Sequence, residues 1–419
     1  MISHPELPQI EIYNSQVIPI NLQKDKTIMI VSSRFKAIKK SLIIGLLFIA
    51  LCINILFVFE SKDELNDFGS FIASGQLANE NKNPYSIDSP LVYSLKFGEN
   101  GPAGYAPNLN PPISVVLFQG LAKIDPTMAI MLWRIVSVIL YFALLAILHK
   151  AYPINGFNGF SRLIFALCLA GFWHTLQLGQ LYVFLLVLCT ITWLFLKKKS
   201  FIAGGIFLGL LIAIKPNFLI WAVLLFAARN WRAILSAALS AVLMSVIPLL
   251  THGITIYKQW IEAVNLYSEN LLLFPGNNSF QGLTARFGFP ETGEILSILL
   301  LIFVLFVVVK YKPGIENING LGILTSLLIS PIAWTGYTLL ALPVFFEKVN
   351  WKWEFKTGAA IYSTPFIIPL HLFTQSFTFF VIFGWFYGWG SIVLFLGFIR
   401  SIFSRTEKIP TITSSIHTN

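Results

Sequence analysis

The chain has 419 residues, of which 56% are hydrophobic and only 11% are charged. Soluble domains carry about 25% charged residues, so this composition excludes an ordinary soluble protein and leaves no room for a sizeable soluble domain. The net charge is +10, but Lys and Arg cluster in short tracts beside apolar segments, as in Lys36–Lys40 and Lys197–Lys199. That distribution is typical of membrane proteins and does not indicate nucleic-acid binding.

Apolar runs recur from Ser41 to Arg400 and predict a bundle of membrane-spanning helices, because about 20 apolar residues cross a bilayer as a helix. The predicted spans are Ser41–Phe59, Met128–Leu148, Leu163–Leu176, Leu181–Leu196, Phe201–Ile214, Phe218–Ala228, Ala233–Leu250, Ile295–Val309, Leu321–Ala333, Tyr337–Phe346, Gly358–Leu370 and Phe377–Phe398. We therefore predict an all-α polytopic membrane protein with about 12 transmembrane helices.

The first helix follows a polar, mixed segment of residues 1–40, which is too long for a cleaved signal peptide, so we expect the helix to be retained as an anchor. The apolar segment Pro112–Ile124 has about 12 residues, too few to span alone. It either re-enters the membrane or crosses as a short helix shielded by protein. If it does not cross, the later basic tracts all fall on the cytoplasmic side, together with both termini.

This topology predicts a membrane domain over residues 41–400 and a cytoplasmic tail over residues 401–419. Two hydrophilic stretches, 60–111 and 252–293, then face outward, and the second contains an amphipathic segment, Tyr257–Leu273, suited to a membrane surface. The high content of Ile, Asn, Lys and Phe is typical of an AT-rich bacterial genome and fits a bacterial plasma-membrane enzyme. The basic tracts predict that both ends of this multi-pass chain are cytoplasmic.

Unusual polar residues gather at the outward ends of the predicted helices. Lys215 precedes Pro216 within a long apolar run, and a Lys inside a membrane helix costs about 2.5–3.5 kcal/mol unless it is paired or functional. Asp67 lies within about two helical turns of the first span. The other candidates are Asn110, Arg134, His174, Gln180, Asn278, Arg286, Trp334 and Tyr337.

Each candidate also has a structural explanation. Asn, Gly and Pro are common in turns, and Lys215 can extend its ammonium to the interface. Arg134 and His174 lie inside apolar segments, where a packing partner satisfies such side chains as well as a ligand does. The three cysteines, Cys52, Cys168 and Cys189, show no metal-ligand spacing and no disulfide framework.

Five short motifs, taken in order, resemble those of glycosyltransferase family 87, the polyprenyl-phosphate-mannose-dependent mannosyltransferases of the GT-C superfamily. They are Asp67-Phe68 with Ala73, Gly75 and Asn83–Ser86; Asn110–Pro112; Leu178–Gln180; Ala203–Gly205 with Gly209 and Ala213–Pro216; and Ser330–Trp334. The resemblance extends from Asp67 to Pro343, which is most of the chain.

The resemblance implies transfer of a sugar, mannose in the family, from a polyprenyl phosphate to an acceptor hydroxyl on the outer face, with inversion at the anomeric carbon. It implies that Asp67 is the base. It implies that Lys215 binds the phosphate of the donor, with Arg286 and Arg134 as further candidates. Contacts to the sugar or acceptor would come from Asn110, His174, Gln180, Asn278, Trp334 and Tyr337.

We expect no cofactor and no dedicated metal site, because no cluster of carboxylates is apparent. The expected partners are membrane lipids, a lipid-linked sugar and a glycan or glycolipid acceptor; the sequence identifies no protein partner.

One position departs from the family pattern. The family often has an acidic residue or His after the tryptophan of the last motif, whereas Trp334 is followed by Thr335-Gly336-Tyr337. Either the substrate differs or Tyr337 takes over that role.

Two other classes of function stay open. A secondary transporter or lipid flippase also has many helices broken by proline, although this chain shows no clear internal repeat. An oligosaccharide ligase or polymerase shares the lipid-phosphate chemistry.

Overall fold

The structure, a computed structural model, describes residues 20–60, 65–96, 103–154, 156–274, 276–348, 351–373 and 375–406. The predicted N-terminal segment and C-terminal tail lie partly outside these ranges. Contacts divide the chain into a first unit that ends at Leu46 and a second unit that begins at Leu47. Helix α1 (Ile20–Glu60) runs across this division. All further description concerns the second unit.

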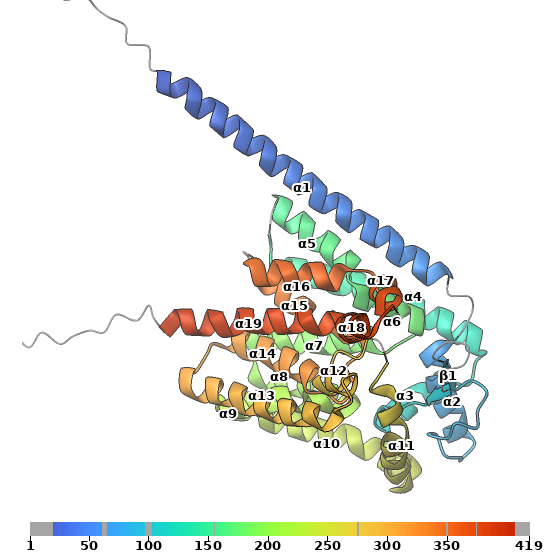
Figure 1. Cartoon of the computed structure of the whole chain (residues 1–419). Coiled ribbons are helices and arrows are strands. Elements are labelled where there is room, and N and C mark those ends of the chain that lie inside the picture. The colour runs from blue at the N-terminus through green and yellow to red at the C-terminus, as the bar shows by residue number, and fades with distance from the viewer. Residues whose placement is uncertain are drawn as a thin grey trace, which may run out of the picture. The chain divides into compact units, whose positions relative to one another are not determined.

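The second unit is almost entirely helical, and many of its longer helices run side by side in Figure 1. After α1 its α-helices are α2 (Asn66–Asn79), α3 (Ile113–Leu121), α4 (Pro126–Ala151), α5 (Gly156–Cys168), α6 (Ala170–Leu178), α7 (Tyr182–Lys197), α8 (Phe201–Ile214), α9 (Leu219–Ala227), α10 (Trp231–His252), α11 (Thr255–Leu271), α12 (Phe280–Ala285), α13 (Pro290–Tyr311), α14 (Ile315–Leu328), α15 (Leu342–Glu347), α16 (Trp353–Ser363), α17 (Ile367–Phe373), α18 (Phe377–Gly384) and α19 (Phe386–Thr406). Two short 3-10 helices, η1 (Pro216–Phe218) and η2 (Thr335–Ala341), complete the helical part. The remaining regular element is an antiparallel hairpin of β1 (Tyr93–Lys96) and β2 (Ala103–Ala106), which pairs Tyr93 with Ala106.

Six helical segments in the described part of the chain are long and apolar enough to cross a membrane. They are Ile38–Val58, Pro126–Ala151, Gly159–Leu178, Trp231–His252, Pro290–Tyr311 and Phe386–Ser404. Three shorter apolar helices are Tyr182–Lys197, Phe201–Ile214 and Pro216–Ala227. The prediction of an all-helical, multi-pass membrane protein is therefore confirmed, while the number of crossings stays a prediction.

The late predicted spans are interrupted. Tyr337–Phe346 is divided between η2 and α15, and Gly358–Leu370 between α16 and α17. The second break lies at Thr364-Pro365, because proline disfavours helical backbone at the residue before it. Phe377–Phe398 is divided at Trp385, whose indole donates a hydrogen bond to the Ser279 carbonyl. These breaks expose polar backbone groups inside the bundle, where other segments bind them.

The segment Pro112–Ile124 forms α3, which has nine residues and packs on α2. At about 1.5 Å per residue it is about 14 Å long, half the hydrocarbon thickness, so it cannot cross alone. Helix α11 forms where the amphipathic segment Tyr257–Leu273 was predicted, with Ile256 buried and Leu266 exposed. In Figure 1, α2, α3, β1 and α11 gather together at one end of the longer helices.

Small residues let α8 and α10 approach closely. A side chain built on Gly209 would collide with the Ala237 carbonyl and lie 2.7 Å from the Ser240 Cβ, and one on Gly205 would collide with the Ala233 carbonyl. Helix association in lipid depends on this kind of close packing, because apolar side chains gain little by leaving the lipid. The pair holds the α8 end that carries Lys215.

We predict that Gly209→Val forces α8 and α10 apart and destabilises the protein by about 1–3 kcal/mol, as overpacking does in cores. The unfolding temperature in detergent, followed by circular dichroism, should fall by several degrees. Gly120→Val in α3 is the matched control, because no atom of the described residues lies within 4 Å of a Cβ at this helical position. Equal melting temperatures for Gly209→Val and the wild type would contradict the packing role.

Candidate active site

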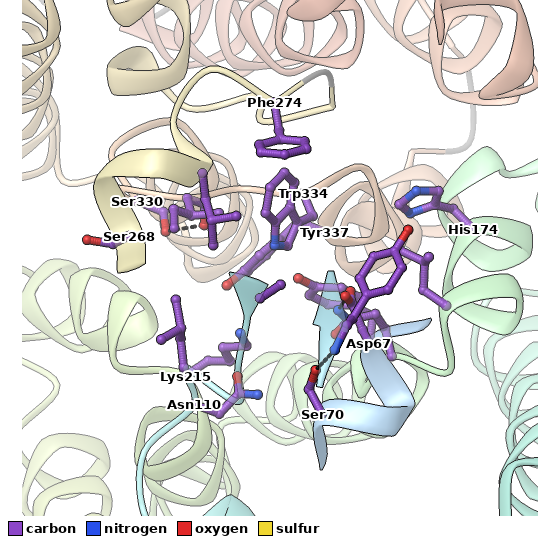
Figure 2. Close-up of a pocket in the computed structure, with 18 of the residues that line it drawn as sticks. Asp67, Ser70, Asn110, His174, Lys215, Ser268, Phe274, Ser330, Trp334 and Tyr337 are labelled. Carbon is purple, nitrogen blue, oxygen red and sulfur yellow. Dashed lines mark hydrogen bonds between the residues drawn. The ribbon is translucent and has the colours of Figure 1, made fainter. Parts of the chain in front are cut away.

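A cavity of about 710 Å³ opens at the end of the bundle where α2 and α11 lie. Its walls come from α2, the segment before α3, the α6–α7 turn, the α8–η1 junction, α11, the segment before η2, and α17. Figure 2 shows the labelled side chains of these elements around the cavity. Segments far apart in the sequence thus contribute to a single site.

Asp67 reaches the cavity from the first turn of α2 and accepts a hydrogen bond from Gln180 Nε2. Gln180 follows Gly179, which ends α6 with a left-handed φ of 66°. Glycine suits this position for two reasons: its backbone conformation, and a Cβ that would lie only 2.5 Å from the Phe68 Cβ. Gly179 therefore lets the α6–α7 turn approach α2 closely enough for Gln180 to bind Asp67.

Asp67 is the one acidic residue among the described residues that line the cavity. Burial raises the pKa of its carboxyl group from 3.8 to about 6, and the Gln180 hydrogen bond and the Lys215 charge both act in the opposite direction. At neutral pH the group is therefore mostly ionised, yet a stronger base than an ordinary carboxylate. Those are the properties that a general base needs near neutral pH.

Lys215 lies between α8 and η1 with an extended backbone, φ −137° and ψ 92°, which the following Pro216 favours. Of the described residues that line the cavity, it is the one Lys or Arg. Its ammonium lies 5.7 Å from the ring centroid of Tyr182 and 5.6 Å from that of Tyr337. The two rings are 4.7 Å apart, so they hold the cation by cation–π attraction and leave its N–H groups available to an anion.

Asn110 and His174 each keep an unpaired polar atom at the cavity wall. Asn110 donates from Nδ2 to Asn108 Oδ1 at 2.9 Å, and its buried Oδ1 has no hydrogen-bond partner among the described residues. His174 packs against Phe366 with ring centroids 4.5 Å apart, and its buried Nδ1 is likewise without a partner there. Buried polar atoms are normally paired, so both suit hydroxyl groups of a ligand.

The last motif supplies another wall. Trp334 and Tyr337 both line the cavity, with Tyr337 only 3% exposed. Ser330 Oγ donates to the Ile332 carbonyl at 2.8 Å and shapes the turn before η2. Tyr337 therefore lines the cavity three residues after Trp334, the last residue of the motif.

The cavity brings together seven of the ten side chains singled out from the sequence, and three do not line it. Arg134 donates to the carbonyls of Leu176 and Gln177, at 3.0 and 3.1 Å, and so binds the C-terminal end of α6. Asn278 binds backbone groups of Gly276 and Gly388, and Arg286 binds carbonyls near α12. Their contacts are with the protein rather than with the cavity.

Other lining residues were not singled out from the sequence. They include Ser70, Tyr93, Tyr182, Trp260, Val264, Ser268 and Leu271. Ser70 lies three residues after Asp67 in α2, on the same helix face. The four α11 residues, Trp260, Val264, Ser268 and Leu271, recur every three or four residues and so also share one face. The spacing along α11 was a usable signal, whereas the position of the Tyr93 hairpin was not.

Within the described ranges, no three His, Cys, Asp or Glu side chains lie close enough together to hold a metal ion.

Comparison with known proteins assigns the chain to a family. The model of glycosyltransferase family 87 matches residues 108–331, more than half of the chain. The matched region contains Asn110, Gln180 and Lys215, whereas Asp67 and Trp334 lie outside it. No curated protein and no solved structure gives a significant match. The chain thus belongs to glycosyltransferase family 87 and is a membrane glycosyltransferase.

Proposed function

We propose that this glycosyltransferase moves a mannosyl group from a polyprenyl phosphate to an acceptor hydroxyl of a glycan or glycolipid, on the outer face of a bacterial plasma membrane. The observation that carries the proposal is the pairing within one cavity of a carboxylate with a raised pKa and an ammonium group held by two tyrosine rings. The first suits a base, and the second suits the phosphate of the donor.

The reaction is a single displacement at the anomeric carbon. The acceptor oxygen forms a bond to this carbon as the bond from carbon to phosphate oxygen breaks, so the configuration inverts. The acceptor proton passes to the Asp67 carboxylate, and polyprenyl phosphate leaves with the electron pair of the broken bond. Gln180 keeps one carboxylate oxygen bound and so orients the other.

Lys215 stabilises the negative charge that develops on the departing phosphate. A Lys ammonium is a compact point charge with three donors, which suits a phosphate oxygen. The tyrosine rings fix the cation before the donor arrives, so little reorganisation is needed as the charge develops.

The sugar and the lipid chain occupy different parts of the cavity. Asn110 and His174 offer unpaired atoms to sugar hydroxyls, while Trp334 and Tyr337 offer aromatic faces. Apolar side chains form the wall for the polyprenyl chain: Phe57, Leu178, Phe366, Leu370 and Phe373. A site with a small polar part and a larger apolar part fits a lipid-linked sugar.

The position of the basic tracts supports an outward-facing site. Lys215 ends α8 and Tyr182 begins α7, and both line the cavity. The tract Lys197–Lys199 lies at the other end of the same two helices, about 20 Å away at 1.5 Å per residue. Because basic tracts favour the cytoplasm, the cavity belongs to the opposite side, in a chain with twelve crossings and both termini inside.

Asp67→Asn should lower transfer of radiolabelled mannose from polyprenyl-phosphate-mannose by about 10²–10⁴-fold, because the amide cannot take the acceptor proton. The assay uses membranes that contain equal amounts of each variant. Asp88→Asn is the matched control, since Asp88 lies on the same outer stretch and binds Ser86 outside the cavity.

Two results would contradict parts of this proposal. Near-normal transfer by Asp67→Asn would remove Asp67 as the base. If the wild type transfers other sugars from polyprenyl phosphate but not mannose, the mechanism stands and the sugar is wrong; silence with every lipid donor would favour a transporter.

Lys215→Met keeps the length of the side chain but removes its charge. Hydrogen bonds to charged groups contribute enough that we expect the KM for the lipid donor to rise about 10–100-fold. Free polyprenyl phosphate should also inhibit this variant less strongly than the wild type, measured by its inhibition constant. An unchanged inhibition constant would show that Lys215 does not bind the phosphate.

The pH dependence of kcat/KM should show an acidic limb near pH 6, because Asp67 must be ionised to act as the base and its pKa is about 6. Gln180→Leu removes a hydrogen bond that lowers this pKa, so the limb should move to higher pH. A limb that stays in place in Gln180→Leu would show that another group titrates.

A further inference from the structure

Arg286 is a buried cation whose hydrogen bonds go to main-chain oxygens. Its guanidinium donates to the carbonyls of Phe274, Asn277 and Gly282, at distances from 2.5 to 3.2 Å, and the residue is 3% exposed. In the part of the chain that the structure describes, no carboxylate forms an ion pair with it. Burial of a charge is costly unless hydrogen bonds compensate, so Arg286 and these carbonyls hold one another in place.

The segment that Arg286 holds is bonded in turn to the wall of the cavity. Asn277 Oδ1 accepts a hydrogen bond from the Ala333 N–H at 3.0 Å, and the Asn278 N–H donates to the Ala333 carbonyl at 2.7 Å. Ser279 Oγ donates to the Pro331 carbonyl at 3.0 Å. We call residues 276–279 the clamp segment; it fixes both ends of the turn that presents Ile332 and Trp334 to the cavity.

The other side of the clamp segment is fixed at the break between α18 and α19. The Gly276 N–H donates to the Gly384 carbonyl at 3.1 Å, and the Trp385 indole donates to the Ser279 carbonyl at 2.8 Å. A Cβ at Gly384 would lie 2.7 Å from Arg286 Nε. A glycine at this position therefore leaves the space that the guanidinium occupies.

Burial lowers the pKa of Arg286 to about 9, so the group stays charged at neutral pH. Its planar fork reaches three carbonyls at once, which the three donors of a Lys at the same position cannot match in geometry. The Arg286 side chain, which does not line the cavity, is thus linked to the cavity wall through a series of hydrogen bonds.

We propose that Arg286 is a positioning residue: through the clamp segment, its guanidinium sets the place of the Ile332–Trp334 wall and hence the fit of the substrate. The inference rests on the proposed function only in taking this cavity as the place of transfer. Figure 2 shows Trp334 projecting into the cavity from this wall. Because a displacement of about 1 Å can cost about 10²-fold in rate, a loosened wall should lower kcat/KM without loss of the fold.

The first test measures the wall directly and needs no glycosyl transfer. Ile332→Cys is placed in a full-length chain whose three native cysteines are replaced by Ala, and its alkylation by a maleimide is followed in membranes. Adding Arg286→Lys should raise the rate of alkylation about fivefold or more, because the wall opens more often. Ala106→Cys reports on the β2 side of the cavity and should keep its rate.

Arg162→Lys is the matched control for loss of a buried guanidinium. Arg162 donates to the carbonyls of Phe346 and Lys348 and does not line the cavity. It should leave the alkylation of Ile332→Cys unchanged. If Arg286→Lys fails to fold, Gly384→Ala carries the test, because its methyl group displaces the guanidinium from the clamp segment while Arg286 is retained.

The second test is kinetic. Arg286→Lys should raise the KM for the donor or the acceptor more than it changes kcat, and the acidic limb set by Asp67 should not move. The inference is overturned if the alkylation of Ile332→Cys stays at the wild-type rate, or if Ile332→Cys and Ala106→Cys react faster to the same extent. Altered alkylation in a protein that transfers no sugar would overturn the proposed function and leave the positioning role supported.

Discussion

The withdrawal of the Asp67 carboxylate from bulk water constrains much of the structure around it. Burial destabilises the ionised form, and the hydrogen bond from Gln180 and the charge of Lys215 compensate for part of that destabilisation. Gln180 reaches Asp67 only because Gly179 lets α6 end in a tight left-handed turn against Phe68. Lys215 lies in extended backbone between the end of α8 and Pro216, and its side chain lines the cavity. The ends of α6 and α8 therefore place the two groups, Gln180 and Lys215, that lower the pKa of the buried Asp67.

Helix breaks elsewhere in the bundle also help to form the site. Irregular backbone within a membrane protein is tolerated where it is buried in protein or lines a cavity, because free N–H and C=O groups are costly in lipid. The break at Trp385 meets this requirement by bonding the clamp segment, and the turn before η2 meets it through Asn277 and Ser279. Backbone N–H and C=O groups that are not bonded within a helix make these segments poor spanning helices. The same groups make the segments suitable walls for a polar site.

The sequence was sufficient to predict the membrane fold, the cavity-lining position of Lys215, and the helix along Tyr257–Leu273. A Lys before a Pro in an apolar run has few structural explanations, and the spacing along α11 is periodic. The sequence could not show that Arg286 binds the protein itself rather than an anion. Its guanidinium binds main-chain carbonyls, which every residue type has, so no sequence pattern indicates this role. Nor could it place the breaks in the late helices, where only tertiary hydrogen bonds stabilise the exposed backbone.

The departure after Trp334 also has a physical interpretation. Tyr337 lies 5.6 Å from the Lys215 ammonium and packs beside Tyr182, so it contributes an aromatic face to the cation rather than a charge. An acidic residue at this place would pair with Lys215 and compete with a phosphate for it. A neutral ring holds the ammonium and leaves its charge for the ligand. Among the described lining residues, this chain therefore keeps Asp67 as the single carboxylate and Lys215 as the single Lys or Arg.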